Sequence, residues 1–242
     1  AEFYARSRRL ASALRRGGVG PGDTVAALML NTPPMLEAHY GVPMAGAVLN
    51  TINTRLDAGA IAFILGHGEA KAVLVDSELV PVLAEALAQM EGGPKIQVIE
   101  YADPTTGAEP SGMGGDYEAF IADGDPDFAW EMPADEWDAI SLNYTSGTTG
   151  NPKGVVYHHR GAALLAMGNV IHAGGGERFT YLWTLPMFHC NGWCFPWTVS
   201  VVAGTHVCLR AVRAEPIYRA IAEEGVTLLC GAPIVMSILL NA

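Results

Sequence analysis

Residues 144–154 read Tyr-Thr-Ser-Gly-Thr-Thr-Gly-Asn-Pro-Lys-Gly, and this stretch is the most informative part of the chain. Glycine lacks a Cβ atom, so a glycine-rich backbone turns sharply and approaches a ligand closely. Hydroxyl and backbone N–H groups donate hydrogen bonds to oxyanions, and an ammonium group neutralises their charge. The stretch therefore indicates a polyphosphate-binding loop. Its candidate ligating residues are Thr145, Ser146, Gly147, Thr148, Thr149, Gly150 and Lys153.

This loop differs from the Walker phosphate loop, in which four residues separate a glycine from a Gly-Lys-Ser/Thr sequence. Here Lys153 precedes a glycine, and no hydroxyl residue follows it. Residues 139–144 and 154–157 are both predicted to be strands, so the loop joins two strands and no helix follows it directly. A surface hairpin without a ligand is the alternative, although a simple hairpin turn needs only about two residues of this kind.

The composition is that of a globular protein with a large core, because half of the 242 residues are hydrophobic and 16% are charged. The net charge of −11 argues against nucleic acid and anionic membrane surfaces as partners. Residues 96–152 contain no Lys or Arg, whereas twelve Asp and Glu fall between residues 100 and 138. We expect this acidic run to form a solvated face. The alternative is that it helps to hold Mg²⁺ beside the phosphate loop.

Predicted strands and helices alternate along the chain, which indicates an α/β fold with a mostly parallel sheet covered by helices. Asp57 is predicted to cap one helix, and Asn31 or Thr32 to cap another that opens with two prolines. Residues 102–116 are rich in Gly, Pro, Ser and Thr, so we expect a surface loop there or a linker between two subdomains. The first predicted helix ends at Gly17-Gly18. No start signal precedes it, so we expect further residues upstream.

Residues 179–209 contain no Asp, Glu, Lys or Arg and are numerous enough to span a membrane. Prolines, Asn191, Gly192 and two histidines interrupt the run. We therefore predict a buried strand over residues 181–185, a turn and a buried helix near residues 193–203, and no membrane span. The four cysteines have spacings that match no common zinc site. We therefore expect no metal site, reduced thiols and a cytoplasmic protein.

The loop and its flanks, residues 144–155, resemble the phosphate-loop signature of the adenylate-forming enzymes, which include acyl-CoA synthetases, luciferases and adenylation domains of peptide synthetases. Residues 21–25 and 53–56 resemble early landmarks of the same large domain. Residues 185–193, Leu-Pro-Met-Phe-His-Cys-Asn-Gly-Trp, are similar to the acyl-binding region of acyl-CoA synthetases. The resemblance covers residues 1–242 in order and implies an incomplete large domain of the adenylate-forming fold.

The resemblance implies a fragment of an ATP-dependent acyl-CoA synthetase that activates a fatty or other small carboxylic acid. ATP, Mg²⁺ and CoA would then be its cofactors and co-substrates, and a homodimer is compatible with the family. The implied acyl pocket includes His189, Asn191 and Trp193, with the Trp193 indole gating the acyl tunnel. A core position is the alternative for His189 and for Trp193.

Other parts of the family pattern have no counterpart in this sequence. The missing parts are the adenine-contacting segment with its metal-binding acid, the ribose-binding aspartate, the hinge and the small C-terminal domain with its catalytic lysine. The resemblance therefore implies that the fragment contains no catalytic residue and is inactive alone. Two other functions stay open: an aryl- or amino-acid-activating enzyme, and a non-catalytic module that binds phosphates or a partner protein.

Overall fold

The computed structural model describes residues 1–90, 92–93, 95–145, 152–173 and 177–242. The chain divides into two compact units. Unit 1 comprises residues 1–29 and 37–159, and unit 2 comprises residues 30–36 and 160–242. The division therefore falls after His159, whereas residues 102–116 lie inside unit 1.

Unit 1 is built on a seven-stranded sheet with the order β5-β4-β3-β1-β2-β6-β7. All neighbouring strands are parallel except β6 and β7, which pair antiparallel. This arrangement confirms the expected α/β fold with a mostly parallel sheet. The strands are β1 (Thr24–Leu28), β2 (Val48–Thr51), β3 (Ala70–Asp76), β4 (Gln97–Tyr101), β5 (Gly115–Asp116), β6 (Ala139–Thr145) and β7 (Lys153–His158).

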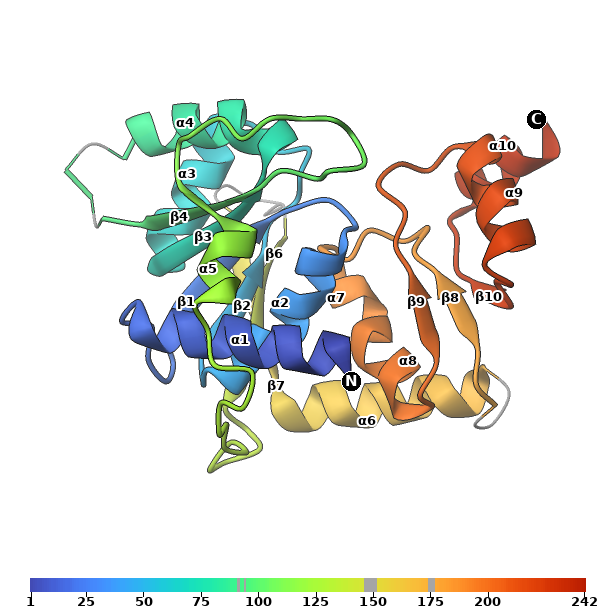
Figure 1. Ribbon diagram of the computed structural model, residues 1–242, viewed down its shortest axis with the longest axis horizontal. Helices are drawn as coiled ribbons and strands as arrows, with labels where there is room; N and C mark the ends of the chain where they lie inside the picture. The colour runs from blue at the N-terminus through green and yellow to red at the C-terminus, as the bar shows by residue number, and fades with distance from the viewer. Residues whose placement is uncertain (91, 94, 146–151, 174–176) are drawn as a thin grey trace. The chain divides into compact units, whose positions relative to one another are not determined.

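Helices cover both faces of this sheet (Figure 1). On one face α3 and α4 pack on β1 and β3, and Ile61 and Leu83 are fully buried in this cluster. The Asp57 carboxylate accepts a hydrogen bond from the Ala60 amide at 2.8 Å, which confirms the predicted helix cap. The helices of this unit are α1 (Glu2–Arg16), the part of α2 (Pro33–Met44) from Glu37 onward, α3 (Ala58–His67), the 3₁₀ turn η1 (Ser77–Leu79), α4 (Val80–Ala88) and α5 (Tyr117–Ala122).

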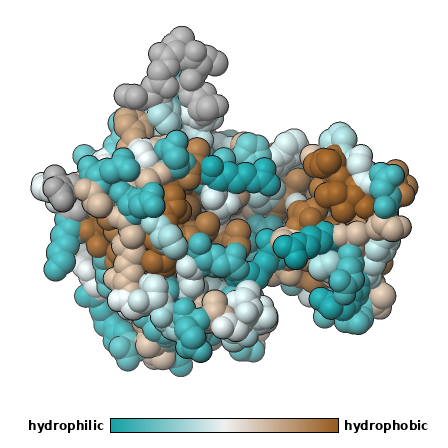
Figure 2. Space-filling view, turned by 90° about the horizontal axis from the view of Figure 1, so that it is seen from above, coloured by the Kyte–Doolittle hydropathy of each residue, from teal (hydrophilic) through white to brown (hydrophobic). Residues whose placement is uncertain are grey.

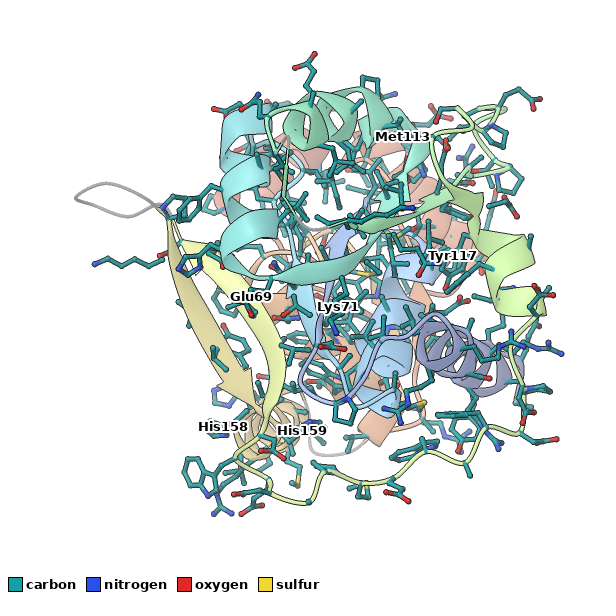
Figure 3. The ribbon with its side chains drawn as sticks, turned by 90° about the vertical axis from the view of Figure 1, so that its left-hand side faces the viewer. Glu69, Lys71, Met113, Tyr117, His158 and His159 are labelled. Atoms are coloured by element: carbon teal, nitrogen blue, oxygen red, sulfur yellow. The ribbon has the colours of Figure 1, made fainter. Side chains whose placement is uncertain are left out.

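A buried carboxylate joins the three helices on the other face. Glu37 of α2 is 2% exposed and pairs with the Arg6 guanidinium of α1. The Tyr117 hydroxyl at the start of α5, marked in Figure 3, donates to the same carboxylate at 2.7 Å. Burial, and then the charge of Glu37, raises the pKa of the Tyr117 hydroxyl well above its ordinary value. Tyr117 therefore stays protonated and donates its proton to this bond. Arg6 also pairs with Glu118, which is 52% exposed.

The acidic run of residues 100–138 is only partly the solvated face that we expected. Glu100 is buried and accepts bonds from Ser77 and from both the amide and the hydroxyl of Ser111, each at 2.7 Å. Burial raises the pKa of Glu100, but these bonds outweigh it and hold the pKa below its ordinary value. Asp103 is also buried and accepts from the Thr105 hydroxyl. These two carboxylates fold the loop after β4, because buried acids need hydrogen-bond donors.

Unit 2 contains a smaller parallel sheet with the order β10-β8-β9. Its hydrophobic core includes the buried residues Leu182, Leu209, Ile217 and Val235, which come from four different segments of the unit. The fully buried rings of Tyr181 and Trp183 pack at an interplanar angle of 82°. The elements of this unit are α6 (His159–His172) from Arg160 onward, β8 (Thr180–Leu182), α7 (Cys190–Trp193), α8 (Phe195–Val201), β9 (Thr205–Val207), α9 (Ala214–Glu223), β10 (Leu228–Leu229) and α10 (Pro233–Leu240).

Large hydrophobic side chains are exposed on the surface of unit 2. Figure 2 shows them gathered over the C-terminal helix α10, where Ile234 and Leu240 are 65% and 85% exposed. None of the helices in the described part of the chain is both long enough and apolar enough to cross a membrane. The uncharged run of residues 179–209 is instead divided among β8, α7, α8 and β9.

The two acidic partners of Arg6 provide a matched test of how burial affects an ion pair. We expect Glu37→Gln to lower the free energy of unfolding by about 3 kcal/mol, because it breaks a buried pair and weakens the bond from Tyr117. Glu118→Gln should change it by only about 0–1 kcal/mol, because water screens the exposed partner. Urea unfolding of both variants measures the difference, and equal losses would contradict the assignment of Glu37 as the structural partner.

Candidate functional site

The β6–β7 hairpin of unit 1 carries the predicted phosphate-binding segment. In its antiparallel register Thr145 lies opposite Lys153, and Tyr144 lies opposite Gly154. The two described ends of the segment are therefore side by side, and Lys153 is exposed. This register confirms that the segment joins two strands. The predicted ligating residues Ser146, Gly147, Thr148, Thr149 and Gly150 lie outside the described residues.

Side chains of α3 and β2 contact β6 just before this segment. The His67 ring, at the end of α3, shares a 2.7 Å hydrogen bond with the Tyr144 hydroxyl. The Phe63 ring stacks on His67 and meets Tyr144 edge-on, with ring centroids 5.2 Å and 6.4 Å apart. Burial raises the pKa of the Tyr144 hydroxyl, so it is protonated at neutral pH. The Thr51 hydroxyl of β2 donates to Asn143 at 3.0 Å. The strand that leads into the loop is thus fixed by its neighbours.

Gly154 allows a close approach of β7 to β6. A Cβ atom there would lie 3.1 Å from Leu142 Cδ1 and within 3.6 Å of the Tyr144 ring. The glycine therefore lets β7 pack closely against β6 beside Lys153. Sequence reasoning identified Lys153 but missed His67, because 77 residues separate His67 from Tyr144 and no local pattern connects them.

In unit 2 the predicted acyl segment forms a left-handed turn. Five consecutive residues have positive φ angles: Cys190 (46°), Asn191 (43°), Gly192 (54°), Trp193 (56°) and Cys194 (62°). This conformation is free of strain for glycine but costs about 1–2 kcal/mol for each of the other residues. Strained backbone of this kind persists only where surrounding contacts hold it, and it is common at functional sites.

Three contacts hold this left-handed turn. The Asn169 amide of α6 donates to the Trp193 carbonyl at 2.9 Å, and the Thr198 hydroxyl of α8 donates to the Cys194 carbonyl at 2.9 Å. The buried Trp183 ring presses on Gly192, where a Cβ atom would lie only 2.7 Å from the indole. Trp183 is itself fixed, because its Nε1 donates to His206 Nδ1 at 3.1 Å.

The predicted acyl-pocket residues differ in exposure. His189 is exposed and Trp193 is 60% exposed, so the core alternative is wrong for both. Asn191 lies between them and is fully buried. The structure therefore brings all three residues into one turn of unit 2. Thr145 and Lys153 lie together in unit 1.

Metal ligands and reactive cysteines are the other candidate features of the chain. Within the described residues, no group of three or more His, Cys, Asp and Glu side chains is placed to hold a metal ion. The four cysteines are free thiols, and burial and then Cys190 raise the pKa of the Cys194 thiol to about 12. Burial therefore disfavours a nucleophilic thiolate at Cys194.

A cavity of about 730 Å³ in unit 1 lies at the end of the sheet where β1, β2 and β6 begin. Its wall includes residues 128–134 together with Asp138 and His159. Figure 3 shows His158 and His159 near the end of β7, and Lys153 begins the same strand. Burial lowers the pKa of His159, although the nearby Asp138 opposes this shift. The cavity is thus separated from the phosphate segment by the length of the hairpin.

Comparisons with known proteins agree with this architecture. The chain is 48% identical to an acetate/butyrate–CoA ligase of Arabidopsis thaliana that is named peroxisomal, over 100% of this chain and 44% of that protein. It is 44% identical to a 2-methylpropanoate–CoA ligase of Humulus lupulus, with the same coverage. The chain therefore spans less than half the length of these relatives.

A benzoate CoA ligase of Burkholderia xenovorans superposes with a TM-score of 0.83 at 25% identity, covering 100% of this chain and 46% of that one. A fatty acyl CoA synthetase of Mycobacterium tuberculosis superposes with a TM-score of 0.80 at 26% identity, covering 98% and 44%. The family model described as "AMP-binding enzyme" matches residues 1–242. With a match along its whole length, the chain belongs to the AMP-binding enzyme family.

Proposed function

We propose that the protein to which this chain belongs is an ATP-dependent acid–thiol ligase that joins a small carboxylic acid to CoA. The main support for this proposal is the register of the β6–β7 hairpin, which places Thr145 at the end of β6 opposite Lys153 at the start of β7. It sets a hydroxyl and an ammonium group beside each other at the ends of a loop rich in glycine and hydroxyl residues. Such a group of donors suits the phosphates of ATP.

The proposed reaction has two steps. A carboxylate oxygen attacks the α-phosphorus of ATP, and pyrophosphate leaves to give an acyl-adenylate. The CoA sulfur then attacks the acyl carbon, its proton is lost, and AMP departs. The first step needs the charge of the leaving pyrophosphate to be stabilised, and such electrostatic stabilisation often contributes more to catalysis than any other effect.

The residues of this chain contribute mainly to binding. Lys153 and the Thr145 hydroxyl, with Ser146, Thr148, Thr149 and the amides of Gly147 and Gly150, would hold the β- and γ-phosphates. Charge-assisted hydrogen bonds of this type contribute about 1.5–3 kcal/mol each. Mg²⁺ belongs to the proposal as the counter-ion of ATP, because it is commonly held by substrate phosphates, waters and only one or two carboxylates.

We infer that the acid is short. The Arabidopsis and Humulus relatives are named for acetate, butyrate and 2-methylpropanoate. The segment of residues 179–209 contains no charged residue, and Trp193 is exposed in its left-handed turn, which suits contact with an alkyl group. An aryl acid is the second candidate, because a trans-cinnamate:CoA ligase of Petunia hybrida is 44% identical to this chain. Activity with a panel of aliphatic and aromatic acids separates the two.

Location and assembly are part of the same proposal. The relative named peroxisomal makes the peroxisome a candidate location beside the cytoplasm, and imaging of the tagged full-length protein distinguishes them. A homodimer of the full-length protein stays a prediction, which light scattering tests.

Lys153→Ala in the full-length protein should lower the rate of acid-dependent ATP–pyrophosphate exchange by about 10- to 1,000-fold, as loss of one electrostatic stabiliser does. Lys71→Ala is the matched control, because Lys71 pairs with Asp23 at 2.9 Å near the start of β3, at the other end of the parallel sheet. Unchanged exchange in Lys153→Ala would favour a non-catalytic module or a hairpin without a phosphate role.

Trp193→Ala should change the order of preference among acids of different chain length, because each methylene in a pocket contributes about 1–3 kcal/mol to discrimination. The measurement is kcat/KM from acetate to octanoate in the full-length protein. Trp137→Ala removes another exposed tryptophan, 63% exposed in unit 1, and should leave the preference unchanged. An equal loss for every acid in Trp193→Ala would show a general folding defect and contradict the pocket assignment.

A further inference from the structure

Asn31 of unit 2 makes hydrogen bonds to a segment more than 150 residues away in the sequence. Its Nδ2 donates to the Trp183 carbonyl at 2.9 Å and to the Leu185 carbonyl at 2.7 Å, and its Oδ1 accepts from the Met187 amide at 2.8 Å. Asn31 is 9% exposed and Met187 is fully buried. The carboxamide therefore uses both of its N–H groups and its oxygen on three backbone groups of one short segment.

These three backbone groups lie where β8 has ended. Trp183 still donates its amide to the Val207 carbonyl at 2.9 Å, but beyond it the chain leaves the sheet. Buried backbone groups outside regular structure need other partners. Asn31 supplies them at Trp183, Leu185 and Met187, and the Thr184 hydroxyl between them donates to the Cys230 carbonyl at 2.6 Å. Among the described residues, Asn31 is therefore the one whose side chain makes the most hydrogen bonds to the backbone of residues 183–187.

The same path leads into the left-handed turn. The His189 amide donates to the Pro186 carbonyl at 3.2 Å, and the Gly192 amide donates to the His189 carbonyl at 2.9 Å. The Trp183 carbonyl accepts a hydrogen bond from Asn31, and the ring of the same residue packs directly against Gly192. A shift of residues 183–187 would therefore move both His189 and the support under Gly192.

Sequence reasoning gave Asn31 a different role, as a possible cap of α2. Its side-chain oxygen instead accepts from Met187. The neighbouring Thr32 hydroxyl makes a local bond of 3.4 Å to the Leu30 carbonyl. Asn31 and Thr32 are thus adjacent buried polar residues, of which only Asn31 reaches the distant segment through its side chain.

We propose that Asn31 is a positioning residue, which holds residues 183–187 so that His189 and the left-handed turn of residues 190–194 have the geometry that binds the acid. The proposal rests on the proposed ligase function for its effect on the acid. The hydrogen bonds that carry it can be tested without activity.

The first experiment measures hydrogen exchange by mass spectrometry in the full-length protein. Asn31→Ala removes all three bonds. Asn31→Asp keeps an oxygen for the Met187 amide but places a carboxylate against two carbonyls. We expect exchange in the peptide of residues 183–192 to be at least about tenfold faster in both. The Met187 amide loses its acceptor in Asn31→Ala, and in both variants the buried Trp183 and Leu185 carbonyls lose their donors, so the segment opens more often. The peptide of residues 2–16 in unit 1 and the Thr32→Val variant serve as controls and should not change.

The second experiment is steady-state kinetics. KM for the acid should rise at least about tenfold in the Asn31 variants, which corresponds to about 1.4 kcal/mol, while KM for ATP stays within about twofold. Asn31→Ser, which retains one hydroxyl donor, should give a smaller increase. It keeps the test valid if Asn31→Ala does not fold.

Unchanged exchange in residues 183–192 would overturn the proposal, and so would faster exchange with KM for the acid unchanged. Equal increases in KM for the acid and for ATP would also overturn it, because they would indicate a general structural loss. An inactive wild-type protein would instead overturn the ligase function, and the exchange data would still decide whether Asn31 fixes the segment.

Discussion

The antiparallel pairing of β6 and β7 is the constraint on which the candidate phosphate site depends. Every other pair in the seven-stranded sheet is parallel, and a parallel connection needs a long crossover. An antiparallel pair allows a short return, so Lys153 comes back opposite Thr145 at the end of β6. The parallel neighbour β2 and the contact of Tyr144 with His67 fix β6 in the sheet. The position of Lys153 is therefore set by the sheet and by these side-chain contacts together.

The features that the sequence predicted are local or periodic. The Asp57 cap, the end of α1 at the glycine pair of residues 17–18 and the strands on either side of residues 146–151 each depend on residues a few positions apart. Alternating strands and helices likewise indicated the mostly parallel sheet. The glycine and hydroxyl composition of residues 144–154 indicated the candidate phosphate site because its chemistry lies within one short segment.

The features that the sequence did not predict depend on distant partners. A strand was expected over residues 181–185, but β8 ends at Leu182, because the Trp183 and Leu185 carbonyls bond to Asn31. A helix was expected from Trp193, but α8 begins only at Phe195, after the left-handed turn. Helix α5 was missed, although Asp116 caps it by accepting from the Ala119 amide at 2.7 Å. Glu100 can be buried because Ser77 and Ser111 donate hydrogen bonds to it, and the local run of acidic residues does not indicate these partners.

The two candidate subsites differ in how their backbone is held, and this difference matches the two kinds of ligand that we propose. The phosphate segment is bounded by a regular hairpin, whose geometry comes from main-chain pairing. This pairing sets the register of Thr145 and Lys153, and the contact of Tyr144 with His67 supports it. The acid segment is a strained turn held by Asn169, Thr198 and the Trp183 ring, and led into by Asn31. Because side chains hold this backbone, a substitution in one of them changes the shape of the turn and leaves the hairpin intact. Under the proposed function, substitutions around the turn would therefore change the acid that is accepted, while the hairpin of the proposed phosphate site would keep its geometry.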